Sequence, residues 1–540
     1  MYECPNCSAN LKYHINKQAL YCEHCETTVD PYSFHKEQDA EESTEYEVTL
    51  FTCPQCGGEI ISEDTTAATF CSYCGSSTIL DSRISRERRP DYIIPFAKTE
   101  VSCRNAYKKM LKQALFAPDA LKDESHIQKF RGIYMPYWVY SFEKKGPATF
   151  KGSKDRRRGD YIITSHYDVS CDIDAEYKGI SFDASSTFCD SLSNAIAPFD
   201  IKKSKPFTPA FLSGFYADIA DVGKSRYKSD ATDIVVDVQK DQFAKTRAFS
   251  KYNITDSQHM SSFKRSLRAD KITIERALFP VWFLSYRKDD RVAYAVVNGQ
   301  TGKVAADLPV DPKKYLLGSF ILAVPLFLLL NLLFTLKPGW LLGLVAILSL
   351  LCTIISNVQL TRILRRESGD DDKGKTNAAP LQKKTQTPSI LQNRWVKILI
   401  MIGACYLLPI IFFFTISPFM LLGLADIALK LFVGFFIVVA LLPFFTLFTR
   451  LIRKKERDTS HSFFGDWKRK LPILAKPLSG ILIAILILII NPVSDLFYYL
   501  GAIACMGMII WGVTDIMKQH NVLSTRKPPQ LNRRGGDEVE

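Results

Sequence analysis

The chain has 540 residues, of which 47% are hydrophobic and 23% are charged, and its formal net charge is +13. This length predicts several domains, and the hydrophobic share, which includes 35 Phe, indicates a membrane portion. Length and composition together exclude a single soluble globule. They favour a multidomain protein with a cysteine-rich start, a mixed middle region and an apolar remainder.

Cysteine pairs occur with the same spacing twice within the first 74 residues. In each copy a C-x2-C pair is followed, after fourteen residues, by a second C-x2-C pair. Each pair can place two thiolates on one tetrahedral ion, and two pairs joined by a short hairpin complete the four-sulfur shell of a zinc ribbon. The sequence therefore predicts tandem ribbons at 1–30 and 51–80, with one Zn²⁺ ion in each. The predicted ligands are Cys4, Cys7, Cys22, Cys25, Cys53, Cys56, Cys71 and Cys74.

Two other interpretations of these cysteines compete with zinc. Disulfides are disfavoured because no signal peptide precedes the first pair, which points to a reducing cytosol. Iron in a four-sulfur site uses the same ligands and stays an alternative, although zinc is favoured. His14, His24 and His35 lie nearby, but four sulfurs already complete each shell, so we interpret these histidines as surface residues.

The charge of the ribbon region limits what it can bind. Residues 1–80 contain thirteen acidic residues, three lysines and no arginine, which gives a net charge of −10. A nucleic-acid surface has to be basic, because neutralised phosphates supply most of the affinity. Nucleic-acid binding is therefore disfavoured. We interpret the acidic segment 31–50 as a linker between the ribbons, with a protein-docking surface as the functional alternative.

The middle region, residues 90–312, is long enough to bury a core of its own. Residues 99–116 have apolar positions at helical spacing behind a Thr99 cap. Residues 161–177 alternate like paired strands, and 230–249 return to a helical pattern. The region is therefore predicted to be an α+β cytoplasmic domain.

Two segments of this domain share an aromatic pattern. Residues 133–140 and 278–286 each contain a proline, Pro136 or Pro280, that precedes a tryptophan by two positions. Each segment is typical of a strand with a buried tryptophan. The match favours two related α+β halves, which would be an internal duplication.

A turn is predicted near residue 300. Residues 292–297 and 302–305 are typical of paired strands, and we expect Asn298-Gly299 to supply the positive φ of the tight turn between them. The same region ends in Gly302-Lys303 but lacks the spacing of a phosphate-binding loop. We therefore interpret it as a hairpin turn.

Apolar runs of about 20 residues, the length that crosses a bilayer core, dominate the sequence after residue 315. We expect an all-α membrane domain of six transmembrane helices that form three hairpins. The hairpins are predicted at 315–360, 396–449 and 472–514. Within them the individual spans are 315–336, 340–360, 396–416, a stretch within 419–448, 472–490 and 496–513.

The basic residues predict the orientation of these spans. The loops 361–395 and 450–471 each carry eight Lys or Arg residues, whereas the opposite turns carry almost none. By the positive-inside rule both loops, the tail 515–540 and the long N-terminal region are cytoplasmic. The protein is therefore expected in the cytoplasmic membrane with both termini in the cytosol and its basic loops on anionic lipid.

A family resemblance rests on the double ribbon, the two Pro-x-Trp elements and the segment 297–303 ahead of Asp307-Leu308-Pro309. Together these features resemble the bacterial TFIIB-type zinc-ribbon membrane proteins, which are often mislabelled as primosomal replication-restart helicases. The resemblance covers about residues 1–312. It implies a membrane partner of the envelope-stress machinery, acting with phage-shock (ESCRT-III-like) and SPFH-type proteins.

The predicted function is that of a cytoplasm-facing adaptor that recruits proteins to the membrane. No enzyme is expected, because no carboxylate pair or nucleophile-base motif stands out. A membrane transporter or channel with a zinc-ribbon regulatory domain is the main alternative. It rests on the prolines inside the spans and on the i,i+4 pair of Asp426 and Lys430. A nucleic-acid-binding protein is a weaker alternative.

Overall fold

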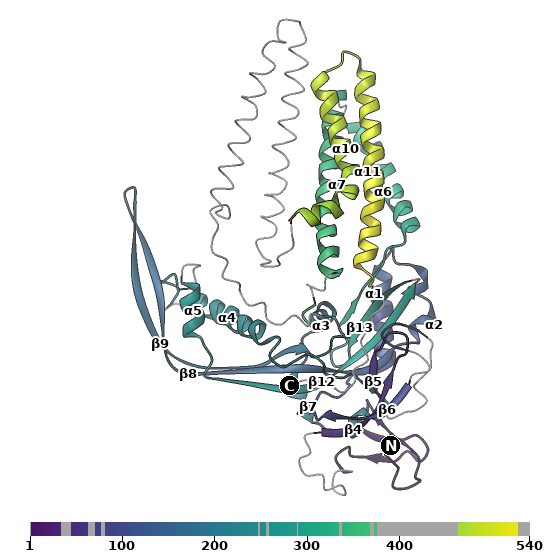
Figure 1. The fold of residues 1–540 in the computed structure, drawn as a ribbon, viewed down its shortest axis with the longest axis vertical. Helices are drawn as coiled ribbons and strands as arrows, with labels where there is room; N and C mark the ends of the chain where they lie inside the picture. Colours follow the sequence, from purple (N-terminus) through teal and green to yellow (C-terminus); the bar gives the residue numbers. More distant parts are fainter. Residues whose placement is uncertain are drawn as a thin grey trace. The chain divides into compact units, whose positions relative to one another are not determined.

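The structure is a computed structural model that describes residues 2–33, 45–62, 71–76, 81–246, 249–254, 259–288, 290–333, 337–367, 372–374 and 463–526. The chain divides into two compact units (Figure 1). We call the first the α+β body; it comprises Met1–Leu308, Asp371–Lys375 and Thr525–Glu540. We call the second the helical unit; it comprises Pro309–Asp370 and Thr376–Ser524.

The first ribbon is a small three-stranded antiparallel sheet of β1 (Leu11–His14), β2 (Ala19–Cys22) and β3 (Thr28–Val29). Leu11 and Leu20 are fully buried, so one face of this sheet packs against the rest of the body. The Tyr13 N–H donates to the Ser213 carbonyl at 3.0 Å, and the Ser213 hydroxyl donates to the Leu11 carbonyl at 2.6 Å. The first ribbon is therefore fixed to the body by hydrogen bonds between its main chain and Ser213.

The body contains an eleven-stranded sheet in the order β10-β7-β12-β8-β11-β5-β4-β6, with β13 and β9 pairing β12 and β8 and with β14 pairing β13. Its strands are β4 (Glu45–Thr52), β5 (Glu59–Ile61), β6 (Asp81–Arg88), β7 (Tyr92–Ile93), β8 (Arg131–Arg158), β9 (Tyr161–Asp183), β10 (Lys205–Pro206), β11 (Tyr216–Ala217), β12 (Lys271–Lys288), β13 (Arg291–Asn298) and β14 (Val304–Ala306). Its helices are α1 (Glu100–Gln113), η3 (Asp119–Leu121), α2 (Glu124–Ile127), α3 (Asp190–Ile196), η4 (Ile201–Lys203), η5 (Pro209–Leu212), α4 (Lys228–Lys245) and α5 (Met260–Ser266).

Several predicted elements of the body are confirmed. Helix α1 begins behind Thr99, whose side chain accepts a hydrogen bond from the Ser102 N–H as an N-cap does. The segment 161–177, predicted as paired strands, belongs to the single strand β9, whose partner is β8, and the helix predicted at 230–249 corresponds to α4, which ends at Lys245. Strand β4 begins at Glu45, so the segment 31–50 predicted as a linker ends in a strand of the sheet.

The two aromatic segments pair with each other around a local pseudo-twofold axis. In the antiparallel pairing of β8 with β12, Met135 lies opposite Phe279, Tyr134 opposite Pro280 and Pro136 opposite Leu278. Equivalent positions of the two segments therefore exchange partners across the axis. This arrangement places the two prolines and two tryptophans symmetrically in one sheet.

The buried tryptophans make the same hydrogen bond in each half. Trp138 Nε1 donates to the Val222 carbonyl at 2.7 Å, and Trp282 Nε1 donates to the Lys98 carbonyl at 2.9 Å. Both carbonyls lie in the segment that leads from a short strand, β11 or β7, into a helix, α4 or α1. Each tryptophan thus holds a segment that lies far from it in the sequence. The body contains, beside the ribbons, two halves with the same β-α-α-β-β order, β7-α1-α2-β8-β9 and β11-α4-α5-β12-β13, and each half contributes to the sheet of the other.

The predicted hairpin at 292–305 is confirmed, but the expected source of its positive φ was wrong. The positive φ, 82°, occurs at Gly302 and not at Gly299. Gly299 is needed for a different reason, because a Cβ there would lie 2.6 Å from the Phe96 ring and 2.8 Å from Pro280 Cβ. Asn298 Oδ1 accepts the N–H groups of Gln300 and Thr301, both at 2.9 Å. The segment is thus a tightly packed structural turn.

Asp183 occupies the position in the first half that Asn298 occupies in the second. The N–H of the next residue donates to a strand proline in both cases, Ala184 to Pro136 and Gly299 to Pro280, each at 2.8 Å. Asp183 is 2% exposed, and its Oδ2 has no hydrogen-bond partner among the described residues. Burial, together with the nearby Asp190 carboxylate, raises the pKa of the Asp183 carboxyl well above its ordinary value. Folding therefore favours the protonated carboxyl.

Replacing Asp183 with Asn is expected to stabilise the body, and the gain should grow with pH. A folded-state pKa above the unfolded value gives stability that is complete below the unfolded pKa, 3.8, and is lost as pH rises through the folded pKa. Asn cannot ionise, so the variant keeps that stability. Thermal unfolding of both proteins at about pH 6 and pH 8.5 tests this. A stability gap that shrinks with rising pH would contradict the assignment.

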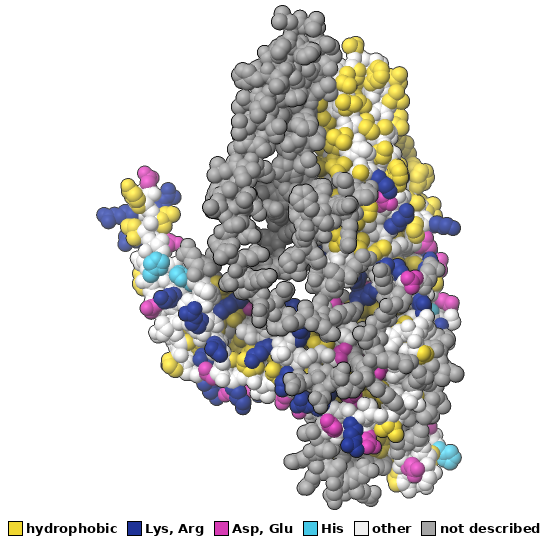
Figure 2. All heavy atoms as spheres, in the orientation of Figure 1, with side chains coloured by type: hydrophobic (Ala, Val, Ile, Leu, Met, Phe, Trp, Pro, Cys, Tyr) yellow, Lys and Arg dark blue, Asp and Glu magenta, His cyan; other side chains and the backbone are white. Residues whose placement is uncertain are grey.

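The helical unit contains α6 (Pro312–Leu333), α7 (Pro338–Glu367), α10 (Phe463–Ile490) and α11 (Asp495–Leu523). All four are long and apolar enough to cross a membrane by length and composition. Large apolar side chains cover the outer surface of these helices (Figure 2); Trp340, for example, is 74% exposed. Such continuous apolar exposure fits lipid and not water. These four helices include the predicted first and third hairpins.

Parts of the prediction for the membrane region are untested. The predicted spans at 396–416 and within 419–448 lie outside the described residues, as do Asp426 and Lys430. Helix α11 continues to Leu523, so the predicted tail 515–540 begins within the last turns of this helix.

Candidate metal centres

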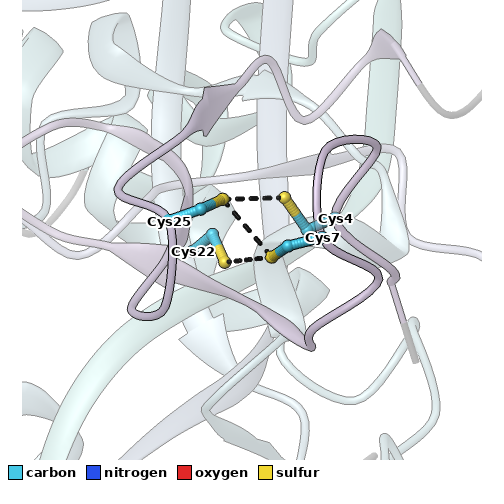
Figure 3. Close-up of side chains that lie close together, drawn as sticks. All are labelled: Cys4, Cys7, Cys22 and Cys25. Carbon is cyan, nitrogen blue, oxygen red and sulfur yellow. Dashed lines mark hydrogen bonds between the residues drawn. The ribbon is translucent and has the colours of Figure 1, made fainter.

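The first tetracysteine site lies where two knuckles meet at one end of the β1–β2 hairpin. Cys22 ends β2 and pairs with Leu11 at the start of β1, which brings the two C-x2-C pairs together. The sulfur of Cys7 lies 3.4 Å from those of Cys22 and Cys25, and Cys4 lies 3.4 Å from Cys25 (Figure 3). Cys4 and Cys22 are buried, whereas Cys7 and Cys25 are half-buried. This site is therefore open to solvent on one side.

The second tetracysteine site lies inside the body. The Cys53 and Cys56 knuckle connects β4 to β5, and the Cys71 and Cys74 knuckle folds against it. The sulfurs of Cys53 and Cys74 are 3.8 Å apart, and those of Cys56 and Cys71 are 3.7 Å apart. All four cysteines are buried. This site is therefore part of the hydrophobic core.

Both sites fit a tetrahedral metal ion. Four sulfurs that each lie about 2.3 Å from one centre are about 3.8 Å from one another. The observed separations of 3.4 to 3.8 Å approach this value, and all sulfurs within a site lie within 4.8 Å of one another. A disulfide would need a sulfur separation of about 2 Å, and all eight cysteines are free. Each predicted set of four ligands can thus hold one metal ion.

The neighbouring histidines do not join these sets. Within the part of the chain that the structure describes, the two metal-competent groups consist of cysteine alone. His24 is exposed, and His14 Nδ1 accepts the Lys17 N–H at 3.3 Å. His35 lies outside the described residues. Four sulfurs complete each tetrahedral shell and leave no open position for water, which is typical of a structural metal and not of a catalytic one.

Thiol acidity favours metal uptake at the first site. A hydrogen bond from the Thr27 hydroxyl, whose oxygen lies 3.1 Å from the sulfur, and the Thr27 N–H lower the pKa of the Cys25 thiol to about 6. A thiolate is the form that binds metal, so this cysteine is ready to bind at neutral pH. At the second site, hydrogen bonds led by that from Cys56 lower the pKa of the Cys53 thiol. Each site therefore has at least one thiol poised as a first ligand.

All four knuckles share one backbone geometry. The residue four positions after the leading cysteine donates its N–H to that cysteine's carbonyl, at 2.8 to 3.0 Å. This residue has a positive φ in every knuckle. The φ values are 57° at Ser8, 59° at Glu26, 72° at Gly57 and 70° at Gly75. Glycine adopts this conformation at no steric cost, whereas Ser8 and Glu26 are strained. The backbone strain at Ser8 and Glu26 therefore lowers the stability of the first ribbon.

Replacing Glu26 with Gly is expected to stabilise the first ribbon by about 0.5 to 1 kcal/mol, because it relieves left-handed strain at the cost of some unfolded-state entropy. Ser8→Gly should act similarly. The measurement is the rate at which a chelator removes the more labile metal ion, which should fall. The matched control is Gly57→Ser in the second ribbon, which introduces the same strain and should destabilise. Faster metal loss from the Glu26 variant would contradict the strain argument.

The second site is integrated with the sheet through Tyr73. This residue lies inside the Cys71–Cys74 knuckle, is 1% exposed, and packs its ring edge-to-face on Phe283 at 6.2 Å. Its carbonyl accepts the Tyr294 hydroxyl at 2.7 Å. Gly75 lies against β12, where an added Cβ would be 3.3 Å from Arg287 Cβ. Metal at this site therefore fixes the knuckle that packs on β12 and β13.

Two short segments that sequence analysis placed in loops contact the body. Lys373, from the predicted basic loop 361–395, donates its N–H to Asp190 at 2.8 Å and forms an ion pair with Asp230. Arg526, from the predicted tail 515–540, pairs with Val292 through two main-chain hydrogen bonds of 2.7 and 2.8 Å. No local pattern around either residue distinguishes it from other basic loop residues. Sequence reasoning therefore missed both.

A half-buried ion pair in the helical unit was also missed. Lys476 Nζ on α10 lies 2.6 Å from Asp515 Oδ2 on α11 and 4.5 Å from the Trp511 ring centroid. The Asp515 side chain is only 12% exposed. Ser349 on α7 donates to the Pro477 carbonyl nearby. The sequence shows an acidic residue, Asp515, after an apolar run. Which basic residue pairs with it depends on how the helices are rotated about their axes.

The comparisons with known proteins assign no family to the chain. No protein family matches it, and no solved structure does. A protein of Bacillus subtilis (strain 168), "Uncharacterized protein YdjG", is 27% identical over 318 residues. The shared region covers 91% of that protein and 58% of this chain. This chain is therefore similar, over somewhat more than half of its length, to nearly all of a shorter protein.

Proposed function

We propose that this protein is a multi-pass membrane adaptor whose zinc-containing body faces the cytosol and recruits other proteins to the cytoplasmic membrane. The observation that carries the proposal is how the chain connects its units. The α+β body, with both four-sulfur sites inside it, is joined to the helical unit at Leu308–Pro309 and again at Ser524–Thr525. Closed metal sites hold a shape and perform no reaction. The body therefore offers a rigid surface on a membrane anchor.

The metal in the proposal is Zn²⁺, two ions per chain. Four cysteines in a closed tetrahedral shell are a common structural zinc set, whereas iron would use the same ligands in a redox role. Elemental analysis of the purified full chain tests this. Two zinc ions per chain support the proposal, and stoichiometric iron contradicts it.

The anchor in the proposal is six spans with both termini in the cytosol. Four candidate spans are described, and the basic loops 361–395 and 450–471 set the orientation. Labelling of cysteines introduced near 338 and 455 with a membrane-impermeant reagent tests the topology. External labelling is expected near 338, and external labelling near 455 would contradict it.

The first ribbon presents the acidic surface that the proposed partner would contact. Glu3, Glu23 and Glu26 are exposed on it, and the whole of residues 1–80 has a net charge of −10. Such a surface repels nucleic acid and attracts a basic face of another protein. Phage-shock and SPFH-type proteins are the partners that the family resemblance implies.

The decisive experiment is affinity purification of the full chain from detergent, with mass spectrometry of co-purifying proteins. Charge reversal by Glu3→Lys and Glu23→Lys should reduce recovery of the partner. The matched control reverses two exposed acids on α4, Asp237→Lys and Asp241→Lys, and should leave recovery unchanged. A chain that purifies without any specific partner would contradict the adaptor proposal.

A transporter is the second candidate, and the half-buried pair of Lys476 and Asp515 favours it. Ionisable residues within spans often mark ion or solute pathways. The pair is close to the ends of the predicted spans 472–490 and 496–513, where an ion pair also serves to join helices. Flux through liposomes that contain the purified chain, abolished by Asp515→Asn, would support transport. Unchanged flux in that variant would argue against this pathway.

A further inference from the structure

The β8–β9 hairpin extends well beyond the core of the body (Figure 1). Its strands pair from Tyr137 opposite Asp183 to Arg158 opposite Tyr161. The inner part is covered by α4 and α5, where Phe150 packs against Phe243 and Phe263. The outer part is bare: every residue from 154 to 168 is exposed. We call residues 154–165 the hairpin tip.

One face of the hairpin tip combines cations with apolar side chains. Residues directly opposite each other in paired strands point to the same face, and alternate residues along a strand share a face. Arg158 lies opposite Tyr161, Arg156 opposite Ile163 and Lys154 opposite Ser165, so these six share one face. Tyr161 is 78% exposed and Ile163 is 47% exposed. Figure 2 shows basic and hydrophobic side chains together at this end of the hairpin.

The cations of this face are not neutralised. Asp155 lies between Lys154 and Arg156 in the sequence but points to the opposite face of the hairpin. There its Oδ1 accepts a hydrogen bond from the Thr164 hydroxyl at 2.7 Å. Among the described residues, no carboxylate lies within ion-pair distance of Arg156 or Arg158. Both guanidinium groups therefore face outward with full charge.

We propose that the hairpin tip binds the surface of an anionic phospholipid bilayer. Arginine and lysine side chains pair with lipid phosphates, and Tyr and Ile side chains enter the boundary between headgroups and acyl chains. Neither feature alone is sufficient, but the face has both and has no acid. Candidate spans in the same chain give the hairpin tip a high effective concentration of bilayer surface. This inference does not depend on the adaptor role.

Other partners fit this face less well. A second copy of the chain would bring three cations against three cations, which repel each other. Nucleic acid fits the tip less well because Ile163 and Tyr161 would contribute to binding only by stacking on bases. The flanking Asp155 and Asp160 also reduce the positive charge that phosphates would contact. Both alternatives are outcomes that the following experiment separates from lipid binding.

The test uses the full chain in nanodiscs, with a photoreactive benzoylphenylalanine in place of Tyr161. In discs with about one-third anionic lipid, a level that gives a strongly negative surface, irradiation is expected to attach lipid at position 161. A probe at exposed Ser170, nearer the core, should attach none. Equal lipid attachment in neutral discs, attachment to a second copy or absence of any adduct would overturn the proposal.

Matched charge variants separate the two faces of the hairpin. Arg156→Ser with Arg158→Ser removes two cations from the proposed face and should weaken lipid attachment about 30-fold, since each contributes about a factor of five. Lys151→Ser with Arg157→Ser removes two cations from the opposite face and should change it little. An unchanged zinc content confirms that both variants remain folded. Equal effects of the two pairs would contradict a defined lipid-binding face.

Discussion

Replacing Cys53 and Cys56 with Ser is expected to unfold the α+β body, whereas replacing Cys4 and Cys7 with Ser should loosen only the first ribbon. Each double variant should lose one of the two metal ions that the sites can hold. A structural zinc site contributes about 10 to 16 kcal/mol, which is as large as the whole stability of a typical domain. The two sites differ in how much of the surrounding structure each one holds in place.

The second site holds a knuckle whose Tyr73 packs against Phe283 and Tyr294, in the centre of the sheet. Its four cysteines belong to the same buried cluster as Met135 and Phe279, where the two halves pair. The first site holds a separate three-stranded sheet; Cys4 and Cys22 reach a buried cluster of the body, whereas Cys7 and Cys25 are half-buried at its edge. Loss of metal should therefore spread from the second site but remain local at the first.

Hydrogen exchange of the full chain measures the difference. Strands β8 and β12 should lose protection in the second-site variant and keep it in the first-site variant. The control is Cys103→Ser, which alters a fully buried thiol that binds no metal and should cost only about 1 to 2 kcal/mol. Equal protection of β8 in both metal-site variants would show that the second site is not integral to the core.

Replacing Asp515 with Ala is expected to destabilise the helical unit by about 3 kcal/mol, because Lys476 would keep its charge between packed helices without a partner. A double change of Lys476→Met and Asp515→Leu removes both charges at similar volume and should recover most of this loss. Thermal unfolding of the full chain in detergent measures both effects.

The double variant also separates structure from transport. If the pair only joins α10 to α11, the double variant should be stable and otherwise unaltered. If the pair serves a solute pathway, the double variant should be stable and inactive. A single Asp515→Ala variant as stable as the wild type would show that the pair contributes nothing to helix packing.

The parts of the structure that were predictable from sequence depend on short-range chemistry. A C-x2-C pair sets two sulfurs on one knuckle whatever surrounds it, so both ligand sets came directly from spacing. The Thr99 cap and the β13–β14 hairpin are local as well. The Pro-x-Trp match correctly related two segments that the fold brings face to face. Apolar run length located the four described candidate spans.

What could not be predicted depends on packing between distant segments. The positive φ near residue 300 lies at Gly302, whereas the glycine at 299 is required by the close approach of Phe96 and Pro280. The pairing of Lys476 with Asp515 requires the rotation of two helices, which run length does not determine. The burial of the second ribbon in the main sheet depends on Tyr73, an ordinary aromatic residue in sequence terms.

The pairing of Arg526 with Val292 sets an order of events during synthesis. These two residues are more than two hundred positions apart, and all four described candidate spans lie between them. At typical translation rates Arg526 is made roughly 10 to 50 s after Val292. The body must therefore wait, with one main-chain edge unfilled, until the membrane helices have been made. The body can thus complete its fold only after the helices between its two parts have been synthesised.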